Sequence, residues 1–262
     1  APSGVITSNA ILNYDGKASQ IKSINQGIKT VQIERNRDSQ IATMELVTMN
    51  NSKNNCSDMV LLGRIPFQGN TSVISGEDLG TTENVKLLGG IQENIQNPNM
   101  TTIYYSTNEA ATKDLNNSNN GWTKNVSNWN EVKSYMIVLK GEVKPGVVLK
   151  YTYDFEIPGE LQYEKAIYGS FGGYYNRKQE KMISYESTEA SKVGLITETK
   201  PNINVQVYPY GEQQEVQDGQ IVTLVAKVEN NSKIDLENAT LKVSVPTGTR
   251  YVKQEKQETE EE

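Results

Sequence analysis

The residue types that most often perform catalysis are scarce in this chain. Among its 262 residues there are 0 histidines and 1 cysteine, Cys56, which lies in the polar stretch NNCSD. A cysteine becomes a nucleophile when a neighbouring base or cation favours its thiolate. The missing histidine and the polar surroundings predict that Cys56 is an unreactive thiol on an exposed turn. We expect no catalytic residue and no enzymatic activity.

Carboxylates are the remaining candidates for acid and base chemistry, as in glycoside hydrolysis. Asp154 and Glu156 lie two residues apart in the segment VLKYTYDFEIP, and Glu142 precedes that segment. Residues two apart in a strand share one face of a sheet. Because the opposite face carries the large apolar residues, we expect these carboxylates on a solvated outer face.

A possible calcium loop is the third candidate. Oxygen-bearing side chains recur every second residue in KDLNNSNNGW, at Asp114, Asn116, Ser118 and Asn120. This spacing before a glycine is typical of a calcium loop, but such a loop also needs a bidentate glutamate farther on. Ser127 occupies that place. We expect a polar loop without a cofactor, and calcium is the alternative.

Aromatic residues are the candidates for ligand binding. Flat rings present an apolar face on which a sugar can stack, and here they are Tyr104, Tyr105, Trp122 and Trp129. If they were exposed together, the chain would be a carbohydrate-binding module. The interpretation we favour places the tryptophans in the core or between sheets.

Charge and hydropathy exclude two classes of partner. The net charge is −6, with 26 Lys and Arg against 32 Asp and Glu, which disfavours nucleic acid. No run of about 18 apolar residues occurs, so we expect no membrane insertion in this stretch of chain. The acidic segment KQEKQETEEE at 253–262 is expected to be a solvated tail.

Strand patterns position these residues. Apolar and polar residues alternate in VLKYTYDFEIP (148–158), and KTVQIER, TTIYYST and SYMIVLKGE also have the composition of strands. No long segment has a helical period. The sequence predicts an all-β chain, a two-sheet sandwich, whose core holds Met44, Leu46, Met59, Leu61, Ile65, Tyr151, Tyr153 and Phe155.

An internal repeat organises the chain. VTMNNSKNNCSDMVLLGRIP (47–66) and KVENNSKIDLENATLKVSVP (227–246) align at a constant offset, and both contain Asn-Asn-Ser-Lys. The inward positions are apolar in both copies, which predicts one strand–turn–strand unit in two domains. In the first copy the outward positions Val60, Leu62 and Arg64 suggest that residues from about 70 to 146 cover that face.

A looser similarity, between 8–36 and 164–202, suggests the order of the modules. The chain then consists of the closing strands of a preceding repeat (1–36), an enlarged central β-sandwich (37–200), and the opening strands of a following repeat with the acidic tail (201–262). The two ends exchange strands, head to tail, with neighbouring repeats or copies of the chain. The alternative is that 201–252 closes a small sheet on its own or folds back on the central unit.

The segment GQIVTLVAKVENNSKIDLENATLKVSVPTGTRYV (219–252) resembles the start of the conserved repeat domain found in tandem in Gram-positive bacterial surface proteins. The matching features are Gly219, the Asn230-Asn231 turn, Pro246, Gly248 and Tyr251. The resemblance implies immunoglobulin-like β-sandwich modules in tandem, an extracellular location at the cell surface or wall, and a stalk or adhesin role. It supplies no catalytic residues.

Overall fold

The computed structural model describes residues 6–20, 30–93, 101–179, 182–211, 215–232 and 234–253. The helices among them are two short 3-10 helices, η1 (Ser118–Asn120) and η2 (Trp129–Glu131). Within these ranges no helix is long and apolar enough to cross a membrane. The chain forms two compact units, unit 1 (Ala1–Glu198) and unit 2 (Thr199–Glu262). Every other regular element is a strand, which confirms the all-β class.

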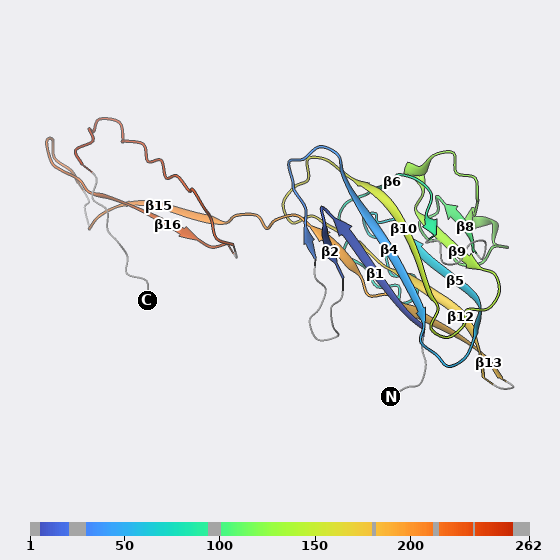
Figure 1. The fold of residues 1–262 in the computed structure, drawn as a ribbon. Coiled ribbons are helices and arrows are strands. Elements are labelled where there is room, and N and C mark those ends of the chain that lie inside the picture. Colours follow the sequence, from blue (N-terminus) through green and yellow to red (C-terminus); the bar gives the residue numbers. More distant parts are fainter. Residues whose placement is uncertain are drawn as a thin grey trace. The chain divides into compact units, whose positions relative to one another are not determined.

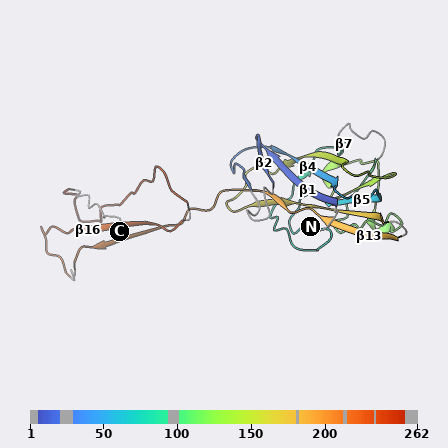
Figure 2. The same cartoon turned by 60° about the horizontal axis from the view of Figure 1, so that its bottom comes forward.

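Unit 1 is a β-sandwich. The first sheet has the order β2–β1–β4–β10–β6, with β7 also paired to β10. Its strands are β1 (Ile6–Tyr14), β2 (Lys17–Ser19), β4 (Gln40–Asn50), β6 (Lys86–Leu87), β7 (Gln92–Glu93) and β10 (Val148–Ile157). In Figure 1 the long strands β1, β4 and β10 run side by side, and Figure 2 shows the same sandwich from another side.

The second sheet has the order β13–β12–β5–β9–β8, and a small third sheet has the order β11–β14–β3. The second contains β5 (Cys56–Arg64), β8 (Thr101–Ser106), β9 (Ser134–Leu139), β12 (Phe171–Gln179) and β13 (Met182–Glu189). The third contains β3 (Val31–Gln32), β11 (Ala166–Gly169) and β14 (Val193–Ile196). Most pairs are antiparallel, but β3 and β14 are parallel.

The core lies between the first two sheets. Alternation along β10 buries every second residue, as the sequence predicts. The eight predicted core residues are all buried, with at most 2% of their surface exposed. Tyr135 of β9 and Tyr153 of β10 meet across the sandwich with ring centroids 5.5 Å apart.

The Asn-Asn-Ser-Lys turn carries the chain from one sheet to the other. β4 belongs to the first sheet, whereas β5 pairs with β9 and β12 in the second. The side chain of Asn50 donates to the carbonyl of Val143 (2.8 Å) and accepts the N–H of Ser52 (3.0 Å). The turn is therefore a corner of the sandwich, held by the segment before β10.

Unit 2 contains the hairpin of β15 (Ile203–Pro209) and β16 (Leu224–Asn230). Ile203 pairs with Asn230 as Ile6 pairs with Asn50 in unit 1. The side chains of Asn50 and Asn230 make the same two hydrogen bonds. Each donates to the backbone carbonyl four residues later in the chain (2.9 Å) and accepts the backbone N–H of the serine two residues later. β15 and β16 thus correspond to β1 and β4, and the strand and turn of the repeat occur in both units.

This correspondence changes the expected module order. β1 pairs with β4 over eight residue pairs, from Ile6↔Asn50 to Asn13↔Thr43. The described residues before 37 therefore open unit 1 and do not close a preceding repeat. The looser similarity is no equivalence, since β1 and β11 lie in different sheets. Unit 2 begins at Thr199, beside the boundary expected at 200, and residues 254–262 of the acidic tail lie outside the described residues.

The second half of the repeat differs between the units. Residues 239–245, which correspond to 59–65 and hence to the later part of β5, form no strand. β5 is held by β9 and β12, and no counterpart of these strands occurs in the described residues of unit 2. A strand without a ladder partner leaves its backbone groups to water, which accounts for the difference.

Candidate functional site

The outer face of β5 is covered, as its apolar residues predict. Leu62 is 3% and Arg64 9% exposed. The Arg64 guanidinium donates through Nη1 to the carbonyl of Ala111 (2.9 Å) and to the Ser134 hydroxyl (2.8 Å). Burial lowers the pKa of Arg64. The loop after β8 is therefore fastened to the sheet by a buried cation.

A second loop covers the neighbouring strand. Gly172 of β12 leaves room for Val73 and Ile74, since a Cβ at Gly172 would lie 2.7 Å from their side chains. The Tyr174 hydroxyl donates to the carbonyl of Val73 (3.3 Å). Glu189 accepts the backbone N–H of Ile74 (2.9 Å). Both loops fall within the range of residues that the sequence predicts as the cover.

Two of the four candidate calcium ligands, Asp114 and Asn120, use their side chains for hydrogen bonds within the loop. Asn120 is buried and its side chain bonds to Thr112, accepting the N–H (3.0 Å) and donating to the hydroxyl (2.9 Å). It also donates to the carbonyl of Asp114 (2.7 Å). Asp114 accepts the N–H of Asn116 (2.9 Å), and Ser118 lies exposed in η1. Asn120 thus closes the loop, while the other three candidates are at the surface.

Two of the four aromatic candidates belong to the core region. Tyr105 is 5% exposed, and its ring meets Trp129 edge to face at 4.9 Å. The N–H of Ile91 donates to the Tyr105 hydroxyl (2.8 Å), and burial raises the pKa of Tyr105. The four rings therefore do not form one exposed surface, because the adjacent residues Tyr104 and Tyr105 of β8 face opposite sides of the sheet.

The other two candidates share the outer face. Tyr105 forms a bridge with Thr123, so Tyr104 lies opposite Lys124 and diagonally from Trp122. The Lys124 ammonium is 5.3 Å from the centroid of the Tyr104 ring. Trp122 donates its indole N–H to the carbonyl of Thr112 (2.9 Å). Both rings are half-buried, so each presents part of its surface to solvent.

Asp154 and Glu156 lie on the outer face of β10, as alternation predicts, and Glu142 is exposed in the loop before β10. Asp154 accepts a hydrogen bond from the hydroxyl of Thr43, and Glu156 accepts one from Ser39 (3.2 Å). Glu142 accepts the side-chain N–H of Asn55 (2.6 Å). In the described ranges no group of three or more Cys, Asp or Glu side chains is placed to hold a metal ion.

Cys56 is buried, contrary to the expectation of an exposed turn. It is fully buried as the first residue of β5, where it exchanges backbone hydrogen bonds with Val143. Burial raises the pKa of the Cys56 thiol. The left-handed backbone of Asp58 (φ 51°) accompanies a register shift against β12. This bulge puts Cys56 and Met59 on the same inward side although they are three residues apart.

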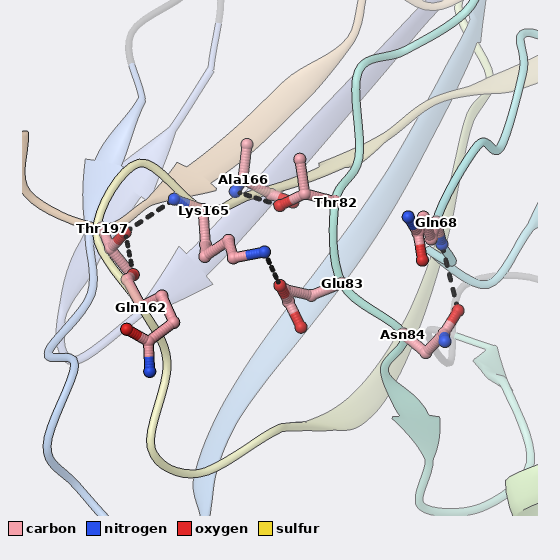
Figure 3. A network of polar contacts seen from close by, with 8 residues as sticks. All are labelled: Gln68, Thr82, Glu83, Asn84, Gln162, Lys165, Ala166 and Thr197. Atoms are coloured by element: carbon pink, nitrogen blue, oxygen red, sulfur yellow. Dashed lines mark hydrogen bonds and ion pairs between the residues drawn. The ribbon is translucent and has the colours of Figure 1, made fainter.

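A polar network holds the end of unit 1 at which β14 finishes. The Thr197 hydroxyl donates to the carbonyl of Gln162 and accepts the N–H of Lys165, both at 2.8 Å. The Lys165 ammonium pairs with Glu83 at 2.9 Å. Figure 3 shows these contacts linking the segment around Glu83 to the strands β11 and β14. The exit of the chain from unit 1 is thus fixed by side chains from three segments.

A polar hollow of about 400 Å³ lies at the same end. Tyr14, Lys17, Arg35 and Glu198 are among the residues that line it. Arg35 is held there by an ion pair with Glu198 (2.6 Å) and by stacking over the Tyr163 ring at 3.4 Å. Arg35 therefore already has two partners.

The hollow also shows where the chain enters and leaves unit 1. Tyr14 ends β1 and Glu198 ends unit 1, and both line the hollow. Ile6 lies at the other end of β1, about 26 Å from Tyr14 at the usual rise of a strand. Figure 1 likewise shows β1 running along unit 1 toward the end at which β2 lies. The chain enters unit 1 at one end and leaves it at the other.

Comparison with known proteins gives structural matches only. No protein-family model and no curated protein matches the chain. The solved structures that resemble it include a variant of BcpA, the major pilin subunit of Bacillus cereus, with 8% identity and a TM-score of 0.40 over 87% of this chain and 54% of that chain. A chain described as BspA_C_mut has 12% identity and a TM-score of 0.36, with 79% and 55% covered.

Two domains of the major pilin SpaD from Corynebacterium diphtheriae have 9% identity and a TM-score of 0.33, with 82% of this chain and 58% of that chain covered. The chain thus spans a little more than half the length of these three chains.

Proposed function

We propose that the chain is a structural module of a bacterial cell-surface protein, in which unit 1 is a load-bearing link of a stalk. The observation that carries the proposal is that the chain enters and leaves unit 1 at opposite ends, with β1 running between them. A module with this layout transmits tension along its length. The role is structural, and no step of chemistry is assigned to it.

The pairing of β1 suits this role. Ladder hydrogen bonds of an antiparallel pair are perpendicular to the strands. Tension along β1 therefore loads all eight pairs between β1 and β4 together instead of one after another. At the exit, the Thr197 and Lys165 contacts hold β14 to its neighbours. Both ends of the force path are thus fastened within unit 1.

A single-molecule pulling experiment tests the proposal. The chain is held through cysteines introduced at Thr7 and Glu198, and Cys56 does not interfere because it is buried. We expect unit 1 to unfold in one step, after which the fully extended chain between the two cysteines spans roughly 630–690 Å. Gradual extension at low force would contradict a load-bearing link.

The surface location is part of the same proposal and follows from the sequence resemblance. Antibodies raised against unit 1 should label intact cells that produce the parent protein, and brief protease treatment of intact cells should remove the label. Labelling that requires permeabilised cells would contradict an extracellular, wall-linked location. This outcome is independent of the pulling experiment.

Carbohydrate binding is a second candidate, favoured by the shared face of Tyr104 and Trp122 around Lys124. Half-buried rings beside a cation offer both stacking and hydrogen bonding to a saccharide. Titration with oligosaccharides should then change the tryptophan fluorescence, and Tyr104→Ala should remove that change. A glycan array without a hit would exclude this candidate and leave the structural role untouched.

A further inference from the structure

Arg64 of β5 carries a buried positive charge that has no carboxylate partner among the described residues. The residue is 9% exposed. Burial lowers its pKa, and the groups that oppose this shift are the phenols of Tyr135 and Tyr174. A charge removed from water is usually balanced by an opposite charge or by a full set of hydrogen bonds. Within the described residues Arg64 has neither, because only part of its guanidinium is bonded to the protein.

The guanidinium keeps two of its three nitrogens available for a ligand. Nη1 donates to the carbonyl of Ala111 and to the Ser134 hydroxyl. Nε and Nη2 donate to no described residue, and they do not belong to the side-chain atoms that are sealed from solvent without a partner. Both nitrogens therefore reach solvent. Together they form the side of the guanidinium that binds a carboxylate through two parallel hydrogen bonds.

None of the described carboxylates of unit 1 supplies the missing charge. Glu109, in the loop that Arg64 holds, pairs with Lys133 at 3.9 Å. Outside the described ranges unit 1 has one acidic residue, Glu180. It follows the last residue of β12, about 27 Å along that strand from the end that pairs beside Arg64. Within unit 1, Arg64 is therefore left with one side open to an external carboxylate.

A second cation lies on the same face of the sheet. Lys113 follows Ala111 by two residues, and its ammonium is 5.4 Å from the centroid of the Tyr174 ring. Burial raises the pKa of Tyr174, whereas the charge of Arg64 opposes this rise, so the guanidinium is also near that ring. The carboxylate of Glu189, which acts on Tyr174 as well, is held by two backbone N–H groups. The two cations therefore lie together, and no described carboxylate pairs with either of them.

We propose that Arg64 binds the carboxylate of a ligand through Nε and Nη2, and that Lys113 adds to the attraction. The ligand is a small organic acid or the C-terminus of a peptide, since both present the same planar group. Two parallel hydrogen bonds favour a planar carboxylate over a spherical anion such as chloride. The site lies on the outer face of the second sheet and is independent of the load-bearing role of unit 1.

Nuclear magnetic resonance of the native chain tests the proposal at the nitrogen itself. The Nε–H signal of Arg64, identified by its loss in Arg64→Lys, should shift with added acetate and reach a plateau. Sodium chloride at the same ionic strength should leave the signal in place. Triglycine and its C-terminal amide distinguish the two sources of the carboxylate. A shift with free triglycine but not with the amide assigns the site to peptide termini as well, and a shift with acetate alone assigns it to small acids.

Two lysine variants give a second readout and leave the buried arginine in place. Lys113→Gln should weaken acetate binding about two- to fivefold, the usual effect of one exposed charge. The matched control is Lys140→Gln, since Lys140 is exposed and follows β9 at the end away from Ser134. This control should bind acetate as the native chain does. An Arg64 signal that acetate does not move, an equal shift with chloride, or equal affinities of the two variants for acetate would each overturn the proposal.

Discussion

At the scale of single residues, the two copies of the turn offer a matched pair of substitutions. Asn50 is buried, and its side chain holds the corner between the sheets. Asn50→Ala leaves buried backbone groups without their partner, and we expect the free energy of unfolding to fall by roughly 2–4 kcal/mol. Asn230 makes the same turn but is exposed, so water replaces the lost bonds in Asn230→Ala.

Urea unfolding followed by circular dichroism and tryptophan fluorescence measures both variants. Both tryptophans lie in unit 1, so their fluorescence reports the unit that Asn50 stabilises. For Asn230→Ala we expect a change below about 1 kcal/mol. Equal losses from the two substitutions would show that the turn itself, and not its burial, sets the cost.

Buried tyrosines predict an alkaline limit to stability. Burial, followed by the contact with Glu186, raises the pKa of Tyr175 to about 12, and burial also raises the pKa values of Tyr135, Tyr151 and Tyr153. A tyrosine in the unfolded chain ionises near pH 10. Its contribution to stability is therefore complete below about pH 10 and is lost as the pH rises through the folded value.

Each such tyrosine lowers the free energy of unfolding by about 1.4 kcal/mol per pH unit in that window. Urea unfolding between pH 8 and 11.5 should show a level region followed by a steep fall. Tyr175→Phe should make the fall shallower, because one fewer proton is released on unfolding. Stability that stays level to pH 11.5 would contradict the buried, neutral state of these rings.

At the scale of elements, Gly63 explains a difference between the repeats. A Cβ at Gly63 would lie 2.1 Å from the Tyr135 hydroxyl oxygen, and Gly63 pairs with Tyr135 across β5 and β9. The corresponding residue of the second copy is Val243. The glycine is thus required where β9 lies beside β5.

Gly63→Ala should consequently destabilise unit 1 by roughly 1–3 kcal/mol, the usual cost of overpacking. The matched control is Gly89→Ala, since nothing lies within 4 Å of its added Cβ. Thermal unfolding of the two variants provides the comparison. A control that loses as much as Gly63→Ala would show that the cost comes from glycine's backbone and not from contact with Tyr135.

The elements were predictable where the local pattern decides them. Alternation identified β10 and its buried face, and the repeated Asn-Asn turn marked the ends of β4 and β16. The partner of each strand is a long-range property. The looser similarity between 8–36 and 164–202 includes the short apolar pair Ala10-Ile11, matched by Ala166-Ile167, and such a pair is common to many strands. It therefore misplaced β1, whose true counterpart is β15.

The candidate sites show the same division. Alternation implies that only one of the adjacent residues Tyr104 and Tyr105 faces outward. Because other segments of the chain pack on both faces of β8, the sequence does not indicate which of the two tyrosines it is. Cys56 was misplaced because the bulge at Asp58 breaks the alternation of β5. The burial of Leu62 and Arg64 beneath other segments was predictable, because a strand that is covered on both faces carries apolar residues pointing to both sides of the sheet.

At the scale of the whole molecule, the chain joins two units that share an opening strand, a second strand and a turn. Among the described residues, only unit 1 has the two packed sheets of a sandwich. Mechanical function is therefore expected of unit 1.

The direction of force is the most direct test of the central claim that unit 1 is a load-bearing link. Unit 1 is pulled either through Thr7 and Glu198, which lie at opposite ends, or through Lys17 and Glu198, which line the same hollow. The first geometry loads the seven β1–β4 pairs from Thr7↔Met49 to Asn13↔Thr43 together, whereas the second opens the strands from one end. We predict a clearly higher unfolding force for the first geometry at the same loading rate. Equal forces in the two geometries would contradict the account.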